Sequence, residues 1–148
     1  RWYRNTNITY SFANNKVTGS YGTATAREHA DTLWTQTDSD NGDLPDEKSV
    51  GDLRAKGLKT VLIETLKKQA AQILQETDWY IIRKADAGTA VPSSITTHRA
   101  AVRTKAAEME TAITNAADTA ALETLYTYTE QEDGSVTRPI GELPTLED

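Results

Sequence analysis

The sequence contains no cysteine among its 148 residues. This absence excludes a disulfide framework, a thiolate metal site and a cysteine nucleophile, and it makes the fold independent of the redox compartment. The sequence also lacks an apolar run approaching the roughly 18 residues of a membrane span, and its N-terminal residues lack a signal-peptide pattern. We therefore expect a soluble protein that is made in a cytoplasm and has no membrane partner.

Apolar residues are scarce as well. They make up 37% of the chain, phenylalanine occurs once, and the mean hydropathy is −0.60. The length suits one domain with its own core, but that core must be lean and rich in alanine. Such a core is typical of a protein that is modestly stable or is stabilised by association.

Basic residues are outnumbered by acidic ones. The net charge is therefore −6, and the isoelectric point is near 4.9. Acidic residues gather in residues 38–49, with a net charge of −4, and in residues 117–148, with a net charge of −7. Nucleic-acid binding normally needs a dominant basic face that neutralises phosphates. We therefore expect no nucleic-acid partner.

The N-terminal region is the part of the chain that favours strands. Residues 8–12 alternate large apolar and small polar side chains, which is the period of a half-buried strand. Asn14 and Asn15 tolerate the positive φ of a tight turn, and residues 17–21 can return as a second strand. The sequence predicts a β-hairpin over residues 8–21, which must pack on something else because a lone hairpin is marginal in water.

The rest of the chain is predicted to be mainly α, in an α+β fold. Leucines recur every fourth residue from Leu58 to Leu66, and apolar residues at a spacing of three to four mark a later helix that packs against the first. A loop over residues 78–92 makes these two helices a hairpin. Residues 1–128 are expected to be one domain, and residues 129–148 an extended acidic tail. The predicted helices cover residues 25–37, 50–76, 93–115 and 119–126, the last of them short.

The candidates for metal binding and catalysis are weak. If Gly42 takes the sixth position of a calcium loop, Lys48 takes the twelfth, where a glutamate is required. His29 and His98 have no second metal ligand at helical spacing, and we interpret them as surface or edge residues. The sequence has neither a Gly-x-Ser-x-Gly element nor a phosphate-binding glycine loop. We therefore expect no enzyme activity, no catalytic, cofactor-binding or metal-binding residue, no cofactor and no small-molecule substrate.

One set of charged residues brackets the loop between the long helices. Asp78 stands beside Trp79 at the end of the first helix, and Arg99 and Arg103 lie four residues apart on the second. Two arginines at this spacing share a helix face, and an aspartate brought alongside them can accept a bidentate bond. We predict a structural clamp of these four residues. The alternative is a set of exposed charges, each worth under about 1 kcal/mol.

These residues also carry a family resemblance. Thr77-Asp78-Trp79, a spacer and then His98-Arg99-Ala100-Ala101-Val102-Arg103, with Leu74 three residues before Thr77, resemble the tail-assembly chaperone domain of bacteriophages. The wider stretch over residues 77–126 is similar to segments of uncharacterised tail proteins from marine and cyanobacterial phages.

The resemblance implies a non-enzymatic bacteriophage protein that binds tail-fibre or baseplate proteins during tail assembly, with self-association as a further expectation. It would act in the host cytoplasm and, if it stays bound, in the virion tail. One alternative is a permanent virion subunit, such as a baseplate, neck or fibre-attachment adaptor. An alternative of another class is a small regulatory binding protein or an enzyme.

The N-terminal aromatic residues are the candidates for partner binding. A hairpin that carries them can add to the sheet edge of a partner. The alternative is that they cover the core of this chain itself. The candidate residues are Trp2, Tyr3, Tyr10, Phe12 and Tyr21.

Overall fold

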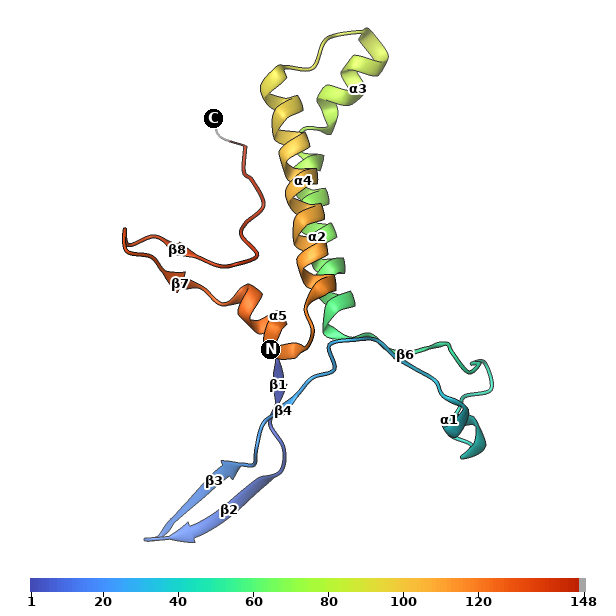
Figure 1. Ribbon diagram of the computed structural model, residues 1–148, viewed down its shortest axis with the longest axis vertical. Coiled ribbons are helices and arrows are strands. Elements are labelled where there is room, and N and C mark those ends of the chain that lie inside the picture. Colours follow the sequence, from blue (N-terminus) through green and yellow to red (C-terminus); the bar gives the residue numbers. More distant parts are fainter. Residues whose placement is uncertain (147–148) are drawn as a thin grey trace.

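The computed structural model describes residues 1–146, which form a helical stalk with three arms leaving its base (Figure 1). The mainly helical α+β class expected from the sequence is confirmed. The helices are α1 (Gln36–Asp40), α2 (Leu58–Gln75), α3 (Asp78–Ala87), α4 (Ser93–Asn115) and α5 (Thr119–Tyr126). The strands pair antiparallel in twos: β1 (Tyr3–Arg4) with β4 (Thr25–Ala26), β2 (Ile8–Ala13) with β3 (Lys16–Tyr21), β5 (Thr32–Leu33) with β6 (Leu53–Ala55), and β7 (Thr129–Glu130) with β8 (Val136–Thr137).

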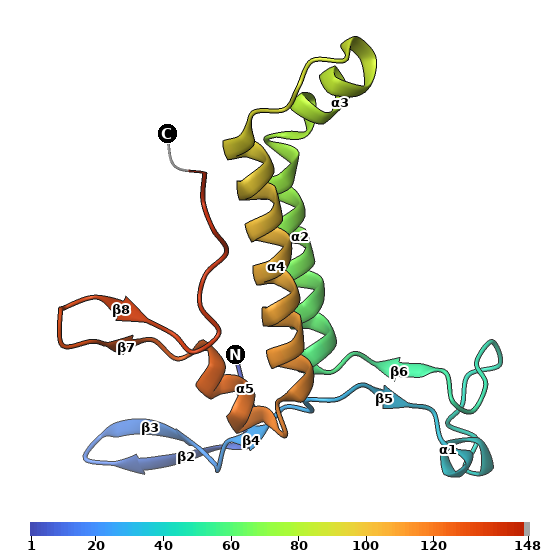
Figure 2. The same ribbon diagram turned by 45° about the horizontal axis from the view of Figure 1, so that its top comes forward.

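The stalk is the helical hairpin of α2 and α4, which lie side by side in both views (Figures 1 and 2). Leucines four residues apart fall on one face of α2 and are buried there, as Leu62 and Leu66 illustrate. From α4, Val102 and Ile113 pack inward and are fully buried. The predicted helix over residues 93–115 is confirmed with its bounds, and so is the short helix over residues 119–126.

The core lies at the base of the stalk, where α5 and the C-terminal segment meet α2 and α4. It is lean, as the composition predicts, but it is not rich in alanine: leucine and isoleucine dominate, with one methionine and one alanine. Its buried members are Leu58, Leu62, Leu66, Met109, Ile113, Ala116, Leu122 and Ile140.

The predicted start of the first long helix is wrong. The helix begins at Leu58 rather than Val50, and Leu53–Ala55 form strand β6. Gly57 marks the break, because a Cβ there would lie 2.2 Å from the backbone carbonyl of Ala30. The segment around Ala30 crosses the chain at Gly57 and prevents α2 from beginning at an earlier residue.

The predicted helix over residues 25–37 is also wrong. Thr25–Ala26 and Thr32–Leu33 pair as strands with distant segments, so that β4 bonds to β1 and β5 bonds to β6. These pairings override a local helical spacing of apolar residues. A short helix does form at the end of this range, because Thr35 and Asp38 make a reciprocal capping box that starts α1 at Gln36. It runs on to Asp40, among the acidic residues 38–49.

The loop predicted over residues 78–92 contains a further helix, α3, at the tip of the stalk (Figure 1). The helix ends at Gly88, which takes a left-handed φ of 67° and closes the helix as glycine commonly does. Its apolar residues are consecutive and show no helical period, so the pattern gave no helix prediction.

The acidic tail is extended only in part. Residues 129–137 form the β7–β8 hairpin, and Ile140 is 3% exposed within the core. The backbone N–H of Ile140 donates to the carbonyl of Leu125 at 3.1 Å, which fastens the tail to α5. Residues 141–146 then continue without regular structure, while the rest of the predicted tail lies outside the described residues.

The predicted hairpin over residues 8–21 is confirmed as β2 and β3. Asn14 and Asn15 form its turn with φ of 51° and 57°, the positive values that a two-residue turn of this kind requires. The hairpin projects away from the stalk in both views (Figures 1 and 2). We call residues 1–26, which include the β1–β4 pair at its base, the N-terminal arm.

Candidate protein-interaction surface

The N-terminal arm is joined to the stalk by residues 27–31, which cross the beginning of α2. The backbone N–H of Leu58 donates to the carbonyl of Glu28 at 3.0 Å, and that of Lys59 donates to His29 at 3.0 Å. The first N–H groups of a helix have no partner within the helix itself. The crossing segment supplies these partners and thereby holds the arm on a fixed base.

Two side chains complete this attachment. The Asp31 carboxylate accepts a bond from the N–H of Gly57 at 2.7 Å. The hydroxyl of Thr119, at the start of α5, donates to the carbonyl of Arg27 at 2.6 Å. Bonds from the Thr60 hydroxyl and the Gly57 N–H lower the pKa of Asp31 below its ordinary value of 3.8. A negative charge at a helix N-terminus is also favoured by the helix dipole.

This contact predicts an acid-sensitive attachment. Because the pKa of Asp31 is lower in the folded state, its stabilising contribution is present above about pH 4 and is lost as pH falls through the folded value. Asp31→Asn should be less stable than the parent at neutral pH and should lose less stability on acidification. Thr60→Val should raise the folded pKa of Asp31 toward its ordinary value, so this variant should also lose less stability on acidification than the parent. Urea unfolding at a series of pH values measures both effects, and an Asp31→Asn profile parallel to the parent would contradict them.

The β2–β3 hairpin has two faces of opposite character. Its register places Ile8 opposite Tyr21 and Phe12 opposite Val17, and residues directly opposite each other share a face. One face is therefore wholly apolar, and the other is almost wholly polar. The apolar face consists of Ile8, Tyr10, Phe12, Val17, Gly19 and Tyr21. The polar face consists of Thr9, Ser11, Ala13, Lys16, Thr18 and Ser20.

This apolar face is uncovered. Tyr10, Phe12 and Tyr21 are 70%, 69% and 64% exposed, and every residue of β2 and β3 is exposed. Within residues 1–146, no element packs over it (Figure 2). Monomeric soluble proteins rarely expose contiguous apolar patches larger than a few hundred Å², and such patches often mark binding sites.

Two side chains of the apolar face, Ile8 and Tyr10 on β2, lie over Gly19 on the neighbouring strand β3. A Cβ on Gly19 would lie 3.3 Å from the Tyr10 ring and 3.2 Å from the end of Ile8. The missing side chain of Gly19 thus leaves room for two larger ones, and aromatic rings commonly cover a strand glycine in this way. This packing makes the apolar face of the hairpin shallow. A shallow face can pack against another flat surface.

The other two N-terminal aromatics have different roles. Trp2 packs against the core, with its ring 5.6 Å from that of Tyr126. The hydroxyl of Tyr3 donates to Glu123 at 3.1 Å, and this bond raises the pKa of Tyr3. Of the N-terminal aromatics, only Trp2 therefore covers the core of this chain, and partner binding by the others stays a prediction. Trp2 and Tyr3 anchor the arm to α5, whereas Tyr10, Phe12 and Tyr21 face outward.

The charged clamp at the other end of the stalk is smaller than predicted, and one member was missed. Arg99 is 8% exposed, and its Nη1 lies 2.9 Å from a carboxylate oxygen of Asp78. The same atom donates to the carbonyl of Leu74 at 2.6 Å and to the hydroxyl of Thr77 at 2.7 Å. Arg99 thus joins the end of α2 to the start of α3. Thr77 belongs to the sequence motif, but only its burial, at 2% exposure, reveals its role.

The other two predicted members lie outside this clamp. Trp79 is 49% exposed, and its ring lies 3.9 Å from that of Tyr80 and 4.7 Å from the guanidinium of Arg83. Arg103 donates to the carbonyl of Arg99 at 3.4 Å, a long bond within α4. One turn of helix separates the two arginines, so only Arg99 reaches the short connection between α2 and α3. His98, expected near the surface, is buried.

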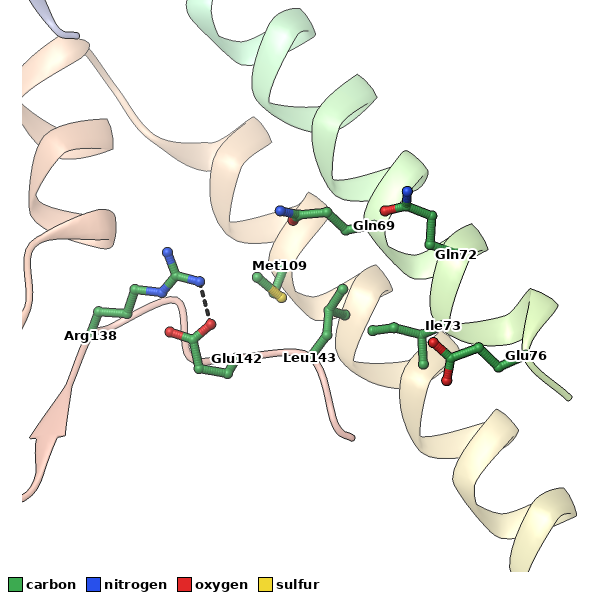
Figure 3. A pocket seen from close by; sticks show the side chains of 8 residues that line it. All are labelled: Gln69, Gln72, Ile73, Glu76, Met109, Arg138, Glu142 and Leu143. Atoms are coloured by element: carbon green, nitrogen blue, oxygen red, sulfur yellow. Dashed lines mark hydrogen bonds and ion pairs between the residues drawn. The ribbon is translucent and has the colours of Figure 1, made fainter. Parts of the chain in front are cut away.

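A groove of about 500 Å³ lies between the stalk and the C-terminal segment (Figure 3). Its floor is apolar, with Ile73, Met109 and Leu143, and Arg138 pairs with Glu142 at 2.6 Å on the tail side. The described lining holds two carboxylates, Glu76 and the Arg138-paired Glu142, but no Ser, Thr, His or Lys beside them. We assign no chemical reaction to this groove.

Two further results concern residues 1–146. This part of the chain contains no cluster of three or more His, Asp or Glu residues placed to hold a metal ion. It also has no helix with the length and hydropathy needed to cross a membrane.

Comparisons with models of known protein families, with curated proteins and with solved structures found no match. The resemblance to phage tail proteins therefore stays a prediction, which rests on the motif around Thr77 and Arg99. The apolar face of the arm is the surface on which a functional argument can be built.

Proposed function

We propose that this chain is a non-enzymatic bacteriophage tail-associated protein that binds tail-fibre or baseplate proteins during tail assembly. The observation that carries the binding role is the N-terminal arm, which extends an uncovered apolar face away from the stalk. The phage context comes from the motif resemblance alone. Binding would take place in the host cytoplasm.

The shape of the molecule supports a binding role over catalysis. Three arms leave the base of the stalk (Figure 2), and each carries exposed apolar residues, for example Phe12, Leu33 and Val136. A chain that spreads such residues over separate projections can contact several neighbours together. Catalysis instead needs converging polar groups in a closed site.

A permanent virion subunit is the second candidate, and the size of the uncovered surface favours it. Exposed apolar area is costly for a chain that acts alone, whereas obligate subunits bury such surfaces in the assembled particle. A baseplate, neck or fibre-attachment adaptor would keep the arm covered throughout the life of the virion.

Co-expression with the tail-fibre protein of the same phage tests the proposal. We expect the fibre protein to co-purify with this chain and to trimerise in higher yield in its presence. Replacing the apolar face by charge, as in Phe12→Glu, should reduce both, while Ser11→Glu on the opposite face should reduce neither. Equal fibre trimerisation with and without the chain would refute the assembly role. Stoichiometric amounts in purified virions would identify the permanent subunit.

A further inference from the structure

We infer that the partner of the arm's apolar face is a second copy of this chain, which packs its own apolar face against the first. This inference deepens the proposed function and rests on it for the biological setting. The dimer would be the unit that binds tail proteins, and the apolar faces would contribute to that binding by holding the two chains together. A charge on the face, as in Phe12→Glu, would then reduce fibre binding by separating the two chains.

The β2–β3 hairpin needs an element or a partner packed against it in order to be stable. A two-stranded sheet is marginal in water unless it gains further strands or packs against another element. Within residues 1–146 the β2–β3 hairpin gains neither, because both of its faces are exposed. A protein partner on the apolar face would supply the missing burial.

The area of the face matches the needs of a symmetric pair. A fully buried aromatic side chain removes roughly 150–250 Å² from water. Tyr10, Phe12 and Tyr21 are each about two-thirds exposed, and Ile8 and Val17 are 42% and 61% exposed. The face therefore presents on the order of 500 Å² of apolar surface. Two such faces would bury on the order of 1,000 Å² together, the lower limit for a specific interface.

The composition of the face favours its own copy over a different protein. Interfaces with transient partners are only about as apolar as an ordinary protein surface, whereas homodimer interfaces are more apolar. The six residues of this face include no charged side chain, and the only charge of the hairpin, on Lys16, lies on the opposite face. A two-fold pair would bring identical neutral surfaces together without burying an unpaired charge.

The faces must meet directly, since pairing through strand edges would leave them exposed. Two hairpins joined edge to edge would make a four-stranded sheet with twice the uncovered apolar area. Two hairpins stacked face to face, about 10 Å apart, would make a small sandwich with a closed interior. The shallow packing of Tyr10 over Gly19 suits such a stack.

Sedimentation equilibrium of the full chain tests this inference. We expect the parent chain to be dimeric at about 100 μM, well above the micromolar Kd that a small interface can reach. Val17→Glu should weaken the dimer by about 100-fold or more, because it places a carboxylate inside the apolar stack. Thr18→Glu is the matched control, since it adds the same charge at the next position on the opposite face, and it should stay dimeric.

Cross-linking of cysteine variants is a second test of the dimer, which still applies if a glutamate variant unfolds the hairpin. The chain has no cysteine, so Val17→Cys and Thr18→Cys each introduce a single thiol. Mild oxidation with copper phenanthroline should join two Val17→Cys chains efficiently through a disulfide and should join Thr18→Cys chains far less.

A parent chain that is monomeric at about 100 μM would overturn the second-copy assignment. Equal dimerisation of both glutamate variants together with equal cross-linking at both thiols would do the same. Failure of the proposed function is a separate result. A dimeric chain that binds no fibre or baseplate protein would refute the tail-assembly role, and a monomeric chain that binds one would refute only the dimer.

Discussion

Gly57→Ala is expected to lower the free energy of unfolding by about 3 kcal/mol. The added Cβ would lie 2.2 Å from the carbonyl carbon and oxygen of Ala30 and 2.8 Å from the backbone nitrogen of Asp31. These are backbone atoms, which no change of rotamer can move aside. The two segments would have to separate, and the bonds from α2 to Glu28 and His29 would be weakened with them.

Urea unfolding followed by circular dichroism measures this loss, and Gly51→Ala provides a control. Gly51 has a φ of 94° but no atom within 4 Å of the added Cβ. Its replacement should cost about 1 kcal/mol from backbone strain alone. If Gly57→Ala proves as stable as Gly51→Ala, the crossing of the arm over the start of α2 is contradicted.

Arg99→Ala is expected to cost about 3 kcal/mol, because it removes two largely buried, charge-assisted hydrogen bonds together with the packing of the long Arg99 side chain. Its guanidinium satisfies the Leu74 carbonyl and the Thr77 hydroxyl, both next to the turn into α3. Loss of these bonds should release α3 from the stalk before the remainder unfolds. Hydrogen exchange of the amides in residues 78–87 should then rise relative to those in α4.

Two neighbouring variants separate this network from ordinary surface charge. Asp78 has a side chain that is 52% exposed, so Asp78→Ala should cost under about 1 kcal/mol. Arg103 is exposed, and within residues 1–146 it makes only the long bond to Arg99, so Arg103→Ala should change stability by less than about 0.5 kcal/mol. Equal effects of Arg99→Ala and Arg103→Ala would show that the buried network is not a structural anchor.

Local sequence patterns predict the stalk and the hairpin well, for physical reasons. Buried residues such as Leu62 and Val102 recur with the helical period because one face of each helix meets the other. Residues 8–12 alternate apolar and polar side chains. This pattern predicts the strand even though neither of its faces is buried within the chain. The Asn14-Asn15 turn adds an independent signal of the hairpin.

The connections at the base are decided by contacts that a local pattern does not contain. Residues 25–37 have helical spacing, but their backbone bonds to β1 and β6 far along the chain. Gly57 is visible in the sequence as a weak point, yet the reason for it is the close approach of Ala30. Long-range pairing of this kind sets strand positions and cannot be found from periodicity.

The candidate interaction surface is likewise predicted only in part by local sequence patterns. Tyr10, Phe12 and Tyr21 share a face through the period of a strand, so the sequence can predict that they act together. Trp2 and Tyr3 look equivalent to them in composition but pack against α5. Ile8 and Val17 belong to the face as well and are recognised once the register is known.

Thiol accessibility in an assembled particle tests the central claim that the apolar face of the arm is a protein-binding surface. Val17→Cys and Thr18→Cys report on opposite faces of the same strand, and the parent chain contributes no other thiol. In the assembly, the cysteine at position 17 should react with maleimide many times more slowly than the one at position 18, and denaturation should abolish the difference. Equally rapid labelling at both positions in every assembly that contains the chain would show that the face stays bare and would contradict the account.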